Sequence, residues 1–303
     1  MKITAVVVTY NRLDKLRLCL EALLSQTAPL HEIVVVNNHS TDGTAAYLDK
    51  MVSEHALVRH YELPENVGGA GGFEKGVGVA VERGADYVWI MDDDTLPESA
   101  ALGELLGAFR AFDNVGFACS RVNWTDGNLH NMNKPWFIVH PDNNRVVETI
   151  TEPVTCERAS FVSIMVSGDV VKKIGLPIGE YFIWGDDTEY TARIIRAGYR
   201  GVYVPASVVT HLTPSNIGAS IVEAPVGASG RFYYQMRNVM ANKRMDTNPV
   251  VAFVSSLFLL RRTLRRIRRR ADHQKEFREQ VMKGFRDGLK FRPVIKFPGT
   301  PRD

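Results

Sequence analysis

The sequence has few cysteines and lacks any long apolar run. Its three cysteines, Cys19, Cys119 and Cys156, are odd in number and widely spaced, which excludes a disulfide framework and matches no metal-ligand or redox spacing. No apolar run approaches the roughly 20 residues that a membrane-spanning helix needs. Met1-Lys2 leads directly into a strand-like segment without a signal-peptide pattern. We therefore expect a cytoplasmic protein with reduced cysteines in its core.

The charge is distributed unevenly along the chain. The net charge of the 303 residues is +3, but residues 261–303 carry 15 Lys and Arg against 5 Asp and Glu, whereas residues 1–260 carry 22 against 29. An acidic body with a basic tail indicates that the tail meets an anionic partner. The apolar content of 45% is that of an ordinary globular protein, and the length suffices for one large or two small domains.

Apolar, β-branched runs alternate with helical patterns in the first hundred residues. Strands are expected at 3–9, 33–36, 58–63 and 87–91. This alternation predicts an α/β fold with a mostly parallel central sheet flanked by helices. Ligands of such sheets bind at the carboxyl ends of the strands. The residues that follow the strands are polar and should share one rim: Thr9, Asn11, Arg12, Asn37, Asn38, Asn66 and the acids at 92–94.

Three consecutive acids, Asp92, Asp93 and Asp94, end the fourth strand. Adjacent carboxylates repel one another, so a fold keeps them at a cost unless a cation lies among them. In an extended chain, Asp92 and Asp94 point the same way and together suit one hard divalent ion, Mg²⁺ or Mn²⁺. The alternative is a solvated acidic turn that caps the helix starting near Pro97.

A glycine-rich segment, residues 66–73, follows the third strand and has four glycines in five positions. Glycine allows close backbone approach and leaves N–H groups free to face phosphate or sugar oxygens. The pattern matches neither the dinucleotide-binding G-x-G-x-x-G nor the P-loop. We interpret it as a turn facing the ligand, with a merely flexible turn as the alternative.

Two further candidates lie in the second half. Asp186 and Asp187 open a helical pattern that runs to Ala197, where one could act as a general base or both could simply cap the helix. His211 ends a short strand at 208–211 and offers either a structural contact or a further metal ligand. Residues 122–154 have weak periodicity, and we expect loops facing the acceptor and short antiparallel strands there.

Six motifs occur in an order that resembles the inverting glycosyltransferases of family 2, which have the GT-A fold. They are VVVTYNR at 6–12, VVVNNHSTDGT at 34–44, NVGGAGGF at 66–73, WIMDDDT at 89–95, FIWGDDTEY at 182–190 and the His211 of VVTHL at 208–212. They cover roughly residues 1–215. The resemblance implies a Mn²⁺ or Mg²⁺ that bridges the nucleotide diphosphate and a catalytic base that activates an acceptor hydroxyl.

The resemblance also implies roles for individual residues. Asp92, Asp94 and His211 would bind the metal, and Asp187 would be the base. The donor would be held by Thr9, Asn11, Arg12, Asn37, Asn38, Asn66, Gly69, Gly72 and Asp93. The acceptor would be contacted by Trp184, Asp186 and Glu189. Asn37 stands where the commoner family motif has aspartate, which leaves the choice between uridine and thymidine open.

The form of the motifs is most similar to galactofuranosyl- and rhamnosyltransferases of bacterial surface polysaccharide synthesis. UDP-galactofuranose is the favoured donor and dTDP-rhamnose the second candidate, with a glycan or polyprenyl-linked acceptor. Two rivals are a non-catalytic sugar-nucleotide-binding scaffold on the same fold and a nucleotidyltransferase. The latter usually has a basic glycine-rich motif after the first strand, where this chain has Thr9-Tyr10-Asn11-Arg12.

We expect a GT-A domain at 1–215, with a nucleotide-binding half at 1–120 and an acceptor half at 121–215, and a basic helical extension at 216–303. After a helix at 229–244, residues 250–260 are mostly apolar and residues 261–270 hold seven arginines. Such a segment suits an anionic membrane surface, here the inner face of the cell membrane. The alternatives are a core helix with a solvated basic stretch, or a homo-oligomer contact. Nucleic acid is not expected, since no aromatic residues lie among the arginines.

Overall fold

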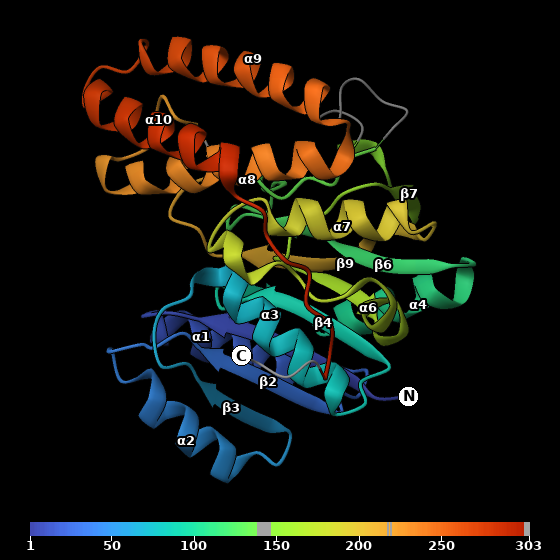
Figure 1. The fold of residues 1–303 in the computed structure, drawn as a ribbon. Coiled ribbons are helices and arrows are strands. Elements are labelled where there is room, and N and C mark those ends of the chain that lie inside the picture. The colour runs from blue at the N-terminus through green and yellow to red at the C-terminus, as the bar shows by residue number, and fades with distance from the viewer. Residues whose placement is uncertain (138–146, 217, 219, 300–303) are drawn as a thin grey trace.

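The computed structural model describes residues 1–137, 147–216, 218 and 220–299. Its centre is a nine-stranded sheet in the order β3-β2-β1-β4-β8-β6-β9-β5, with β7 pairing β9 (Figure 1). The strands are β1 Ile3–Thr9, β2 Glu32–Asn37, β3 Val58–Glu62, β4 Tyr87–Asp92, β5 Thr95–Pro97, β6 Val115–Asn123, β7 Val154–Cys156, β8 Ile164–Ser167 and β9 Arg200–His211. The predicted α/β class is confirmed, and helices cover the sheet on both faces.

The sheet is fully parallel in its first half and mixed in its second half. Strands β3, β2, β1 and β4 are parallel neighbours, as their continuous apolar runs predict. Beyond them β8 runs antiparallel to both β4 and β6, and β5 and β7 run antiparallel to β9. The prediction of a mostly parallel sheet is therefore wrong for the second half, where β8 inserts between β4 and β6 and only β6 and β9 are parallel.

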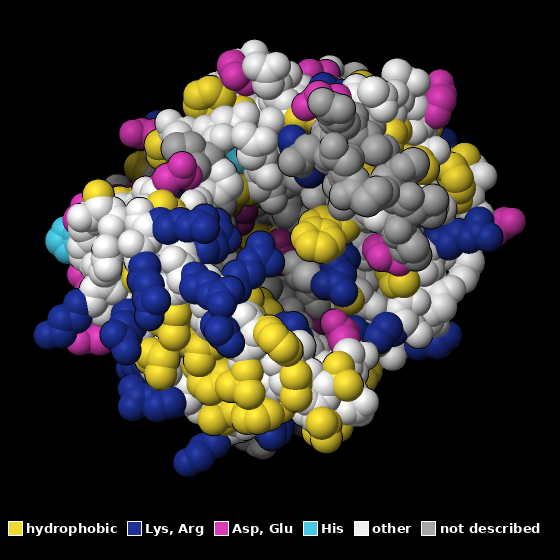
Figure 2. Space-filling model, turned by 90° about the horizontal axis from the view of Figure 1, so that it is seen from above, with side chains coloured by type: hydrophobic (Ala, Val, Ile, Leu, Met, Phe, Trp, Pro, Cys, Tyr) yellow, Lys and Arg dark blue, Asp and Glu magenta, His cyan; other side chains and the backbone are white. Residues whose placement is uncertain are grey.

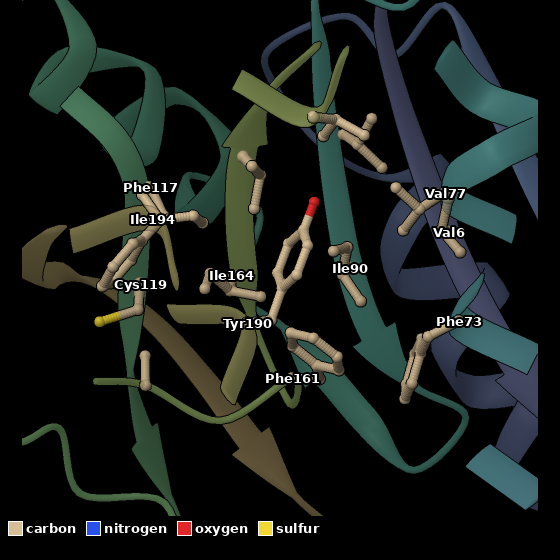
Figure 3. Packing of buried hydrophobic residues seen from close by; sticks show 14 of the residues in the cluster. Val6, Phe73, Val77, Ile90, Phe117, Cys119, Phe161, Ile164, Tyr190 and Ile194 are labelled. Atoms are coloured by element: carbon tan, nitrogen blue, oxygen red, sulfur yellow. The ribbon is translucent and has the colours of Figure 1, made fainter. Parts of the chain in front are cut away.

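Alternating side chains divide the core into two layers. Ala5 and Val7 of β1 face the cluster built with α1 Leu13–Leu24, α2 Thr44–Glu54 and α4 Ala101–Ala111. Val6 and Val8 face the opposite cluster, built with α3 Gly68–Glu82, α6 Gly168–Ile174 and α7 Asp186–Arg196. This alternation follows from the two-residue period of a strand. Figure 3 shows the second layer, in which Tyr190 lies among side chains of the sheet.

Several predicted elements have different bounds in the structure. The apolar runs at 159–167, 201–204 and 208–211 predict three strands. In the structure residues 159–163 precede β8 and are not part of a strand, and residues 201–204 and 208–211 belong to one irregular strand, β9. The glycine-rich segment is not a turn, because from Gly68 onward it is the start of α3. The prediction for the cysteines is confirmed, since all three are free and buried. Part of the 122–154 prediction, residues 138–146, lies outside the described residues.

Three helices complete the chain: α8 Ser229–Asp246, α9 Pro249–Ile267 and α10 Gln274–Lys290. They share an apolar cluster of their own, and short 3-10 turns at Gly179–Tyr181 and Val226–Ala228 precede them. After α10 the chain returns along the sheet domain (Figure 1). There the Leu176 N–H donates to the Lys296 carbonyl at 2.7 Å, and Lys296 Nζ pairs with Glu74 at 2.9 Å. None of the described helices combines the length and apolar character that crossing a membrane requires.

Candidate active site

The carboxyl ends of β1, β2 and β4 meet at one edge of the sheet. In the strand register Thr9 pairs with Asn37, and Val8 pairs with Asp92. The polar residues that follow these strands are therefore neighbours, as predicted. The edge is the one at which parallel sheets bind ligands.

The acidic segment is a tight turn. β4 ends at Asp92, the chain turns at Asp93 and Asp94, and it resumes as β5, where Thr95 pairs with His211 of β9. The extended chain that we assumed for the two ligands is wrong, yet the turn has the same effect. Ligand atoms of Asp92, Asp94 and His211 all lie within 4.8 Å of one another, so the structure brings the three predicted metal ligands together.

The orientation of His211 is set by Asn133. His211 Nδ1 lies 2.9 Å from Asn133 Oδ1, and Asn133 Nδ2 donates to Ser160 Oγ at 3.0 Å, which fixes which end of the amide accepts. Nδ1 therefore carries a proton and Nε2 faces Asp94 Oδ1 at 3.1 Å. Metal-binding histidines have this arrangement, with the second ring nitrogen donating to a fixed acceptor. The donor set of two carboxylates and one imidazole fits Mn²⁺ or Mg²⁺.

Two basic side chains neutralise the acids. Arg12 Nη1 lies 2.9 Å from Asp94 Oδ2 and 3.2 Å from Asp93 Oδ1. Lys15 Nζ lies 3.2 Å from Asp94 Oδ2 and 2.6 Å from the Leu212 carbonyl. Sequence reasoning missed Lys15, whose position one turn into α1 gives no signal in the sequence. Asp93 also accepts from Thr9 Oγ1 at 2.7 Å.

The three acids differ in their proton affinity because their partners differ. Burial, together with the charges of Asp94 and Asp93, raises the pKa of Asp92 to about 7 against the pull of His211 and Arg12. Burial raises the pKa of Asp93 to about 6, opposed by Arg12 and Thr9. Burial acts in the same direction on Asp94, but its hydrogen bond to His211 and the charges of His211, Arg12 and Lys15 hold its pKa well below the ordinary value. Within the described part of the chain, Asp92 is thus the one of the three acids that forms no ion pair.

The predicted donor-side asparagines bind the protein's own backbone. Asn38 accepts from the Val67 N–H at 2.9 Å and donates to the Gly68 carbonyl at 2.9 Å, and Asn66 accepts from the Gly68 N–H at 2.9 Å. Asn37 donates to Glu62 at 2.6 Å and is fully buried. These side chains hold the strand ends to the start of α3. Their contact with a nucleotide stays a prediction, as does that of Asn11, which accepts from the Thr41 N–H at 2.7 Å.

The glycines of α3 are required by packing. A Cβ on Gly72 would lie 2.4 Å from Val8 Cγ1, and one on Gly68, which has a φ of +75°, would lie 2.1 Å from the Phe182 carbonyl oxygen. Gly72 is therefore needed for the close packing of α3 on the sheet, and its predicted donor contact stays a prediction. Gly69 meets nothing closer than Phe73 at 3.9 Å, and its donor contact stays a prediction.

The start of α7 presents the second pair of acids. Asp187 is half-buried and accepts from the Thr188 N–H at 2.6 Å; burial raises its pKa, and the Thr188 bonds oppose this. Asp186 is buried, and its pKa is raised well above the ordinary value by burial and by the charges of Asp187 and Asp92. The Ala70 N–H donates to the Phe182 carbonyl at 3.1 Å, so the segment that precedes this helix lies against the start of α3, at the same edge of the sheet.

Helix α8 holds the segment before this pair. Asn238 Nδ2 donates to the carbonyls of Tyr181, Ile183 and Trp184 at 2.9, 3.1 and 2.7 Å, and Asn242 Nδ2 donates to that of Gly185 at 3.0 Å. Within this segment Phe182 and Trp184 both have a φ of 64°, a conformation that persists only where the surroundings impose it. Sequence reasoning missed both asparagines, because their contacts join residues more than fifty positions apart.

Glu189 has a structural role in place of the predicted acceptor contact. Its side chain is 1% exposed, and its carboxylate pairs with Arg193 at 2.8 Å and Arg196 at 3.3 Å. An acceptor has no access to it, which corrects the prediction. Trp184 is half-buried, and its ring packs edge-on against Phe232 of α8 at 5.4 Å. Its contact with an acceptor stays a prediction.

Comparisons with known proteins agree with this geometry. The model of the family "Glycosyl transferase family 2" matches residues 4–168, more than half of the chain. The galactofuranosyltransferase GlfT1 of Mycobacterium tuberculosis is 28% identical over 205 residues, 64% of each chain. The GlfT1 of Mycolicibacterium smegmatis is 26% identical over 210 residues, 65% of this chain and 66% of its own. The match thus spans slightly less than two thirds of these relatives.

Solved structures share the fold at low identity. A mannosyltransferase of Pyrobaculum calidifontis in complex with GDP-Man and Mn²⁺ matches with a TM-score of 0.57 and 16% identity, over 97% of this chain and 76% of its own. GalNAc-T7 with UDP, GalNAc and Mn²⁺ matches with a TM-score of 0.58 and 15% identity, over 80% of this chain and 48% of its own. The chain therefore belongs to glycosyltransferase family 2 and is a glycosyltransferase with the GT-A fold.

Proposed function

We propose that the protein is a metal-dependent, inverting galactofuranosyltransferase that uses UDP-galactofuranose and a glycan or polyprenyl-linked acceptor in bacterial surface polysaccharide synthesis. The observation that carries this proposal is the group of Asp92, Asp94 and His211 at the edge of the sheet where the parallel strands end. The choice of galactofuranose rests on the two GlfT1 relatives and on the form of the motifs. A rhamnosyltransferase using dTDP-rhamnose is the second candidate.

The donor side would be organised by charge. A Mn²⁺ or Mg²⁺ held by Asp92, Asp94 and His211 would act as a Lewis acid that stabilises the departing nucleotide diphosphate. Arg12 and Lys15, which pair with Asp94 in this structure, lie where their cationic groups can turn to phosphate oxygens. Thr9 and Arg12 hold Asp93, which orients its carboxylate for a contact with the donor sugar.

The acceptor side would supply the base. We assign proton removal from the acceptor hydroxyl to Asp187, which is half-buried and whose raised pKa suits a general base. Asp186 would contact the acceptor; the charges of Asp187 and Asp92 both contribute to its raised pKa. A single displacement by the activated hydroxyl inverts the anomeric centre, through a transition state with oxocarbenium character by analogy with glycoside hydrolysis.

These assignments give each segment of the chain a role. Residues 1–120 would bind the donor and residues 121–215 the acceptor, with residues 216–303 as a helical extension. Within the extension, α9 exposes six apolar side chains in its first half, namely Val250, Val251, Phe253, Val254, Leu257 and Phe258. Figure 2 shows hydrophobic side chains gathered on this face, with Lys and Arg beside them and a hollow nearby. We propose that residues 250–270 contact an anionic membrane surface, the inner face of the cell membrane.

The first test is thermal stabilisation by UDP, dTDP and GDP, each with Mn²⁺ and with EDTA. We expect UDP with Mn²⁺ to raise the Tm, with the effect lost in EDTA, because Asp92, Asp94 and His211 would hold the metal on which nucleotide binding depends. A shift with dTDP in place of UDP would favour the rhamnosyltransferase. Absence of any nucleotide shift would contradict the enzyme assignment at this site and favour the scaffold.

A further inference from the structure

The helical extension contains a cavity that the transfer reaction as described does not use. It has a volume of about 220 Å³ and lies between α8, α9 and α10. Its walls are apolar side chains such as Phe232, Met236 and Val281, while Gln235, Arg262 and Arg266 supply polar groups. A cavity of this size is smaller than the about 300–1,000 Å³ that encloses a whole drug-sized ligand. It therefore suits part of a larger molecule.

The two arginines of the cavity have no acidic partner. They stand four residues apart in α9, so both project from the same face of the helix. Arg262 is exposed and Arg266 is half-buried, and among the described residues no carboxylate lies within 4.0 Å of either guanidinium. By contrast, Arg270, which follows the same helix, pairs with Asp272 at 3.0 Å. Helix α9 itself contains no acid. Two neighbouring unpaired guanidinium groups repel each other and favour an anion with several oxygens between them, such as a phosphate.

The cavity adjoins the acceptor side of the active site through one residue. Phe232 lines the cavity and packs edge-on against Trp184 at 5.4 Å, and Trp184 stands two positions before Asp186. Tyr234 of α8 stacks on the ring of Phe182 at 4.7 Å, and the Phe182 carbonyl accepts from the Ala70 N–H of α3 at 3.1 Å, which places the start of α8 near the start of α3. The apolar side chains exposed along α9 continue outward from the same helix.

We propose that this cavity binds the phosphate and the first hydrocarbon units of a lipid-linked acceptor, with Arg262 and Arg266 on the phosphate. The apolar walls take the start of the chain, and the rest of the chain follows the exposed side of α9 into the membrane. The glycan end of the acceptor then passes Phe232 and Trp184 to reach Asp187. This inference rests on the proposed function, of which it names the acceptor class.

The test uses the full-length protein and farnesyl phosphate as the probe, in micelles of a neutral detergent. Binding is measured by isothermal titration, with farnesol and inorganic phosphate as separate arms. We expect farnesyl phosphate to bind and each half of it, the alcohol or the phosphate, to bind at least about tenfold more weakly, because the site pairs charge with apolar contact. The double variant Arg262→Gln/Arg266→Gln should weaken farnesyl phosphate binding by at least about tenfold.

The matched control is Arg261→Gln/Arg265→Gln, which removes the same charge from exposed positions of α9 that do not line the cavity. We expect it to bind as the parent protein does. Equal losses in the two double variants would overturn the proposal and indicate general attraction to the basic helix. Val239→Phe, which fills the cavity, gives an independent check: it should block farnesyl phosphate while leaving the Tm within a few degrees.

Transfer assays separate this inference from the proposed function. With a lipid-phosphate acceptor the Arg262→Gln/Arg266→Gln variant should raise KM at least about tenfold, whereas with a water-soluble acceptor carrying the same glycan kcat and KM should be unchanged. Unaltered KM for the lipid-linked acceptor would overturn the inference while leaving the transferase assignment intact. Absence of transfer to both acceptors by the parent protein would instead contradict the proposed function.

Discussion

Asn133 illustrates how a residue that never touches a ligand can control a site. Its Oδ1 holds the Nδ1 proton of His211 and so directs Nε2 towards Asp94. We expect Asn133→Leu to raise the Mn²⁺ concentration for half-maximal activity about 10–100-fold, because an unheld imidazole loses its orientation. The control is Asn131→Ala, which removes a side-chain hydrogen bond to the carbonyl of the loop residue Asn216 at 2.8 Å. A metal titration unchanged in Asn133→Leu would contradict the role assigned to the amide.

Asp92 makes the effect of metal depend on pH. In the unfolded chain its carboxyl ionises near 3.8, whereas burial raises its pKa to about 7 in the folded protein. Between these values the folded state holds a proton that the unfolded state lacks, so rising pH through this window removes stability in the absence of metal. Mn²⁺ favours the ionised form and restores that loss.

We therefore expect the rise in Tm caused by Mn²⁺ to be larger at about pH 8 than at about pH 5.5. Scanning calorimetry with Mn²⁺ and with EDTA at both values measures it. In Asp92→Asn, which cannot ionise, the difference between the two pH values should shrink. An equal Mn²⁺ effect at both values in the parent protein would show that Asp92 does not bind the ion.

Asp187 is tested by kinetics rather than by stability. Asp187→Asn keeps the shape of the side chain but removes the base, so kcat should fall by about 10²–10⁴-fold while the Kd for UDP with Mn²⁺ stays within about twofold. Glu189→Gln is the comparison, because it removes a neighbouring charge that binds Arg193 and has no access to the cleft. We expect it to lower Tm more than kcat. A parallel loss of nucleotide affinity in Asp187→Asn would refute a purely acceptor-side role.

The sequence predicts those site residues that belong to a recognisable local pattern, such as polar residues directly after an apolar strand. Asp92 and His211 each end a strand, and Asp94 lies in the turn directly after β4. The ends of strands are where α/β sheets bind ligands, and the structure brings the three ligand atoms together. Lys15 and Asn133 lie in a helix and in an aperiodic loop, and they reach the site only through the fold. No local pattern marks such residues, because their contacts join positions about eighty residues apart or more.

At the scale of elements, α3 depends on glycine to approach the sheet. The Cβ of Gly72→Ala would lie 2.4 Å from Val8 Cγ1, and overpacking of this kind costs about 1–3 kcal/mol. The control is Gly107→Ala in α4, where nothing lies within 4 Å of the added carbon and where alanine stabilises a helix by about 0.5–1 kcal/mol. Urea denaturation of both variants should give shifts of opposite sign. A neutral Gly72→Ala would mean that α3 moves away from β1 without cost.

The sequence predicts strands whose burial gives a continuous apolar run, but it does not predict whether a strand runs parallel or antiparallel to its neighbours. The runs at 3–9 and 87–91 are apolar throughout because both faces are covered by helices, and their bounds agree with β1 and β4 within one residue. The antiparallel insertion of β8 between β4 and β6 has no counterpart in the periodicity, since an apolar run reads the same in either direction. The two strands predicted at 201–204 and 208–211 are one strand, β9, whose register with β6 shifts between them.

At the scale of the whole molecule, we propose that α9 brings the enzyme to a membrane surface that holds its acceptor. The rings of Phe253 and Phe258 are 48% and 69% exposed, and exposed arginines follow them in the same helix. An interfacial helix of this composition places its apolar side chains among lipids and its cations at anionic headgroups. Membrane binding should thus require both the apolar side chains of α9 and anionic lipids in the membrane.

We expect the protein to sediment with vesicles that contain anionic lipid and to remain in solution with vesicles of neutral lipid. Raising the salt from about 0.1 M to about 0.5 M should weaken the binding, because exposed charges are screened. Phe253→Asp/Phe258→Asp should lower the partition coefficient about tenfold or more, since each half-buried ring contributes about 1 kcal/mol. Leu18→Asp/Leu57→Asp is the matched control, because these side chains are 45% and 38% exposed on the sheet domain. Equal losses in both variants would assign the exposed face of α9 to something other than a membrane.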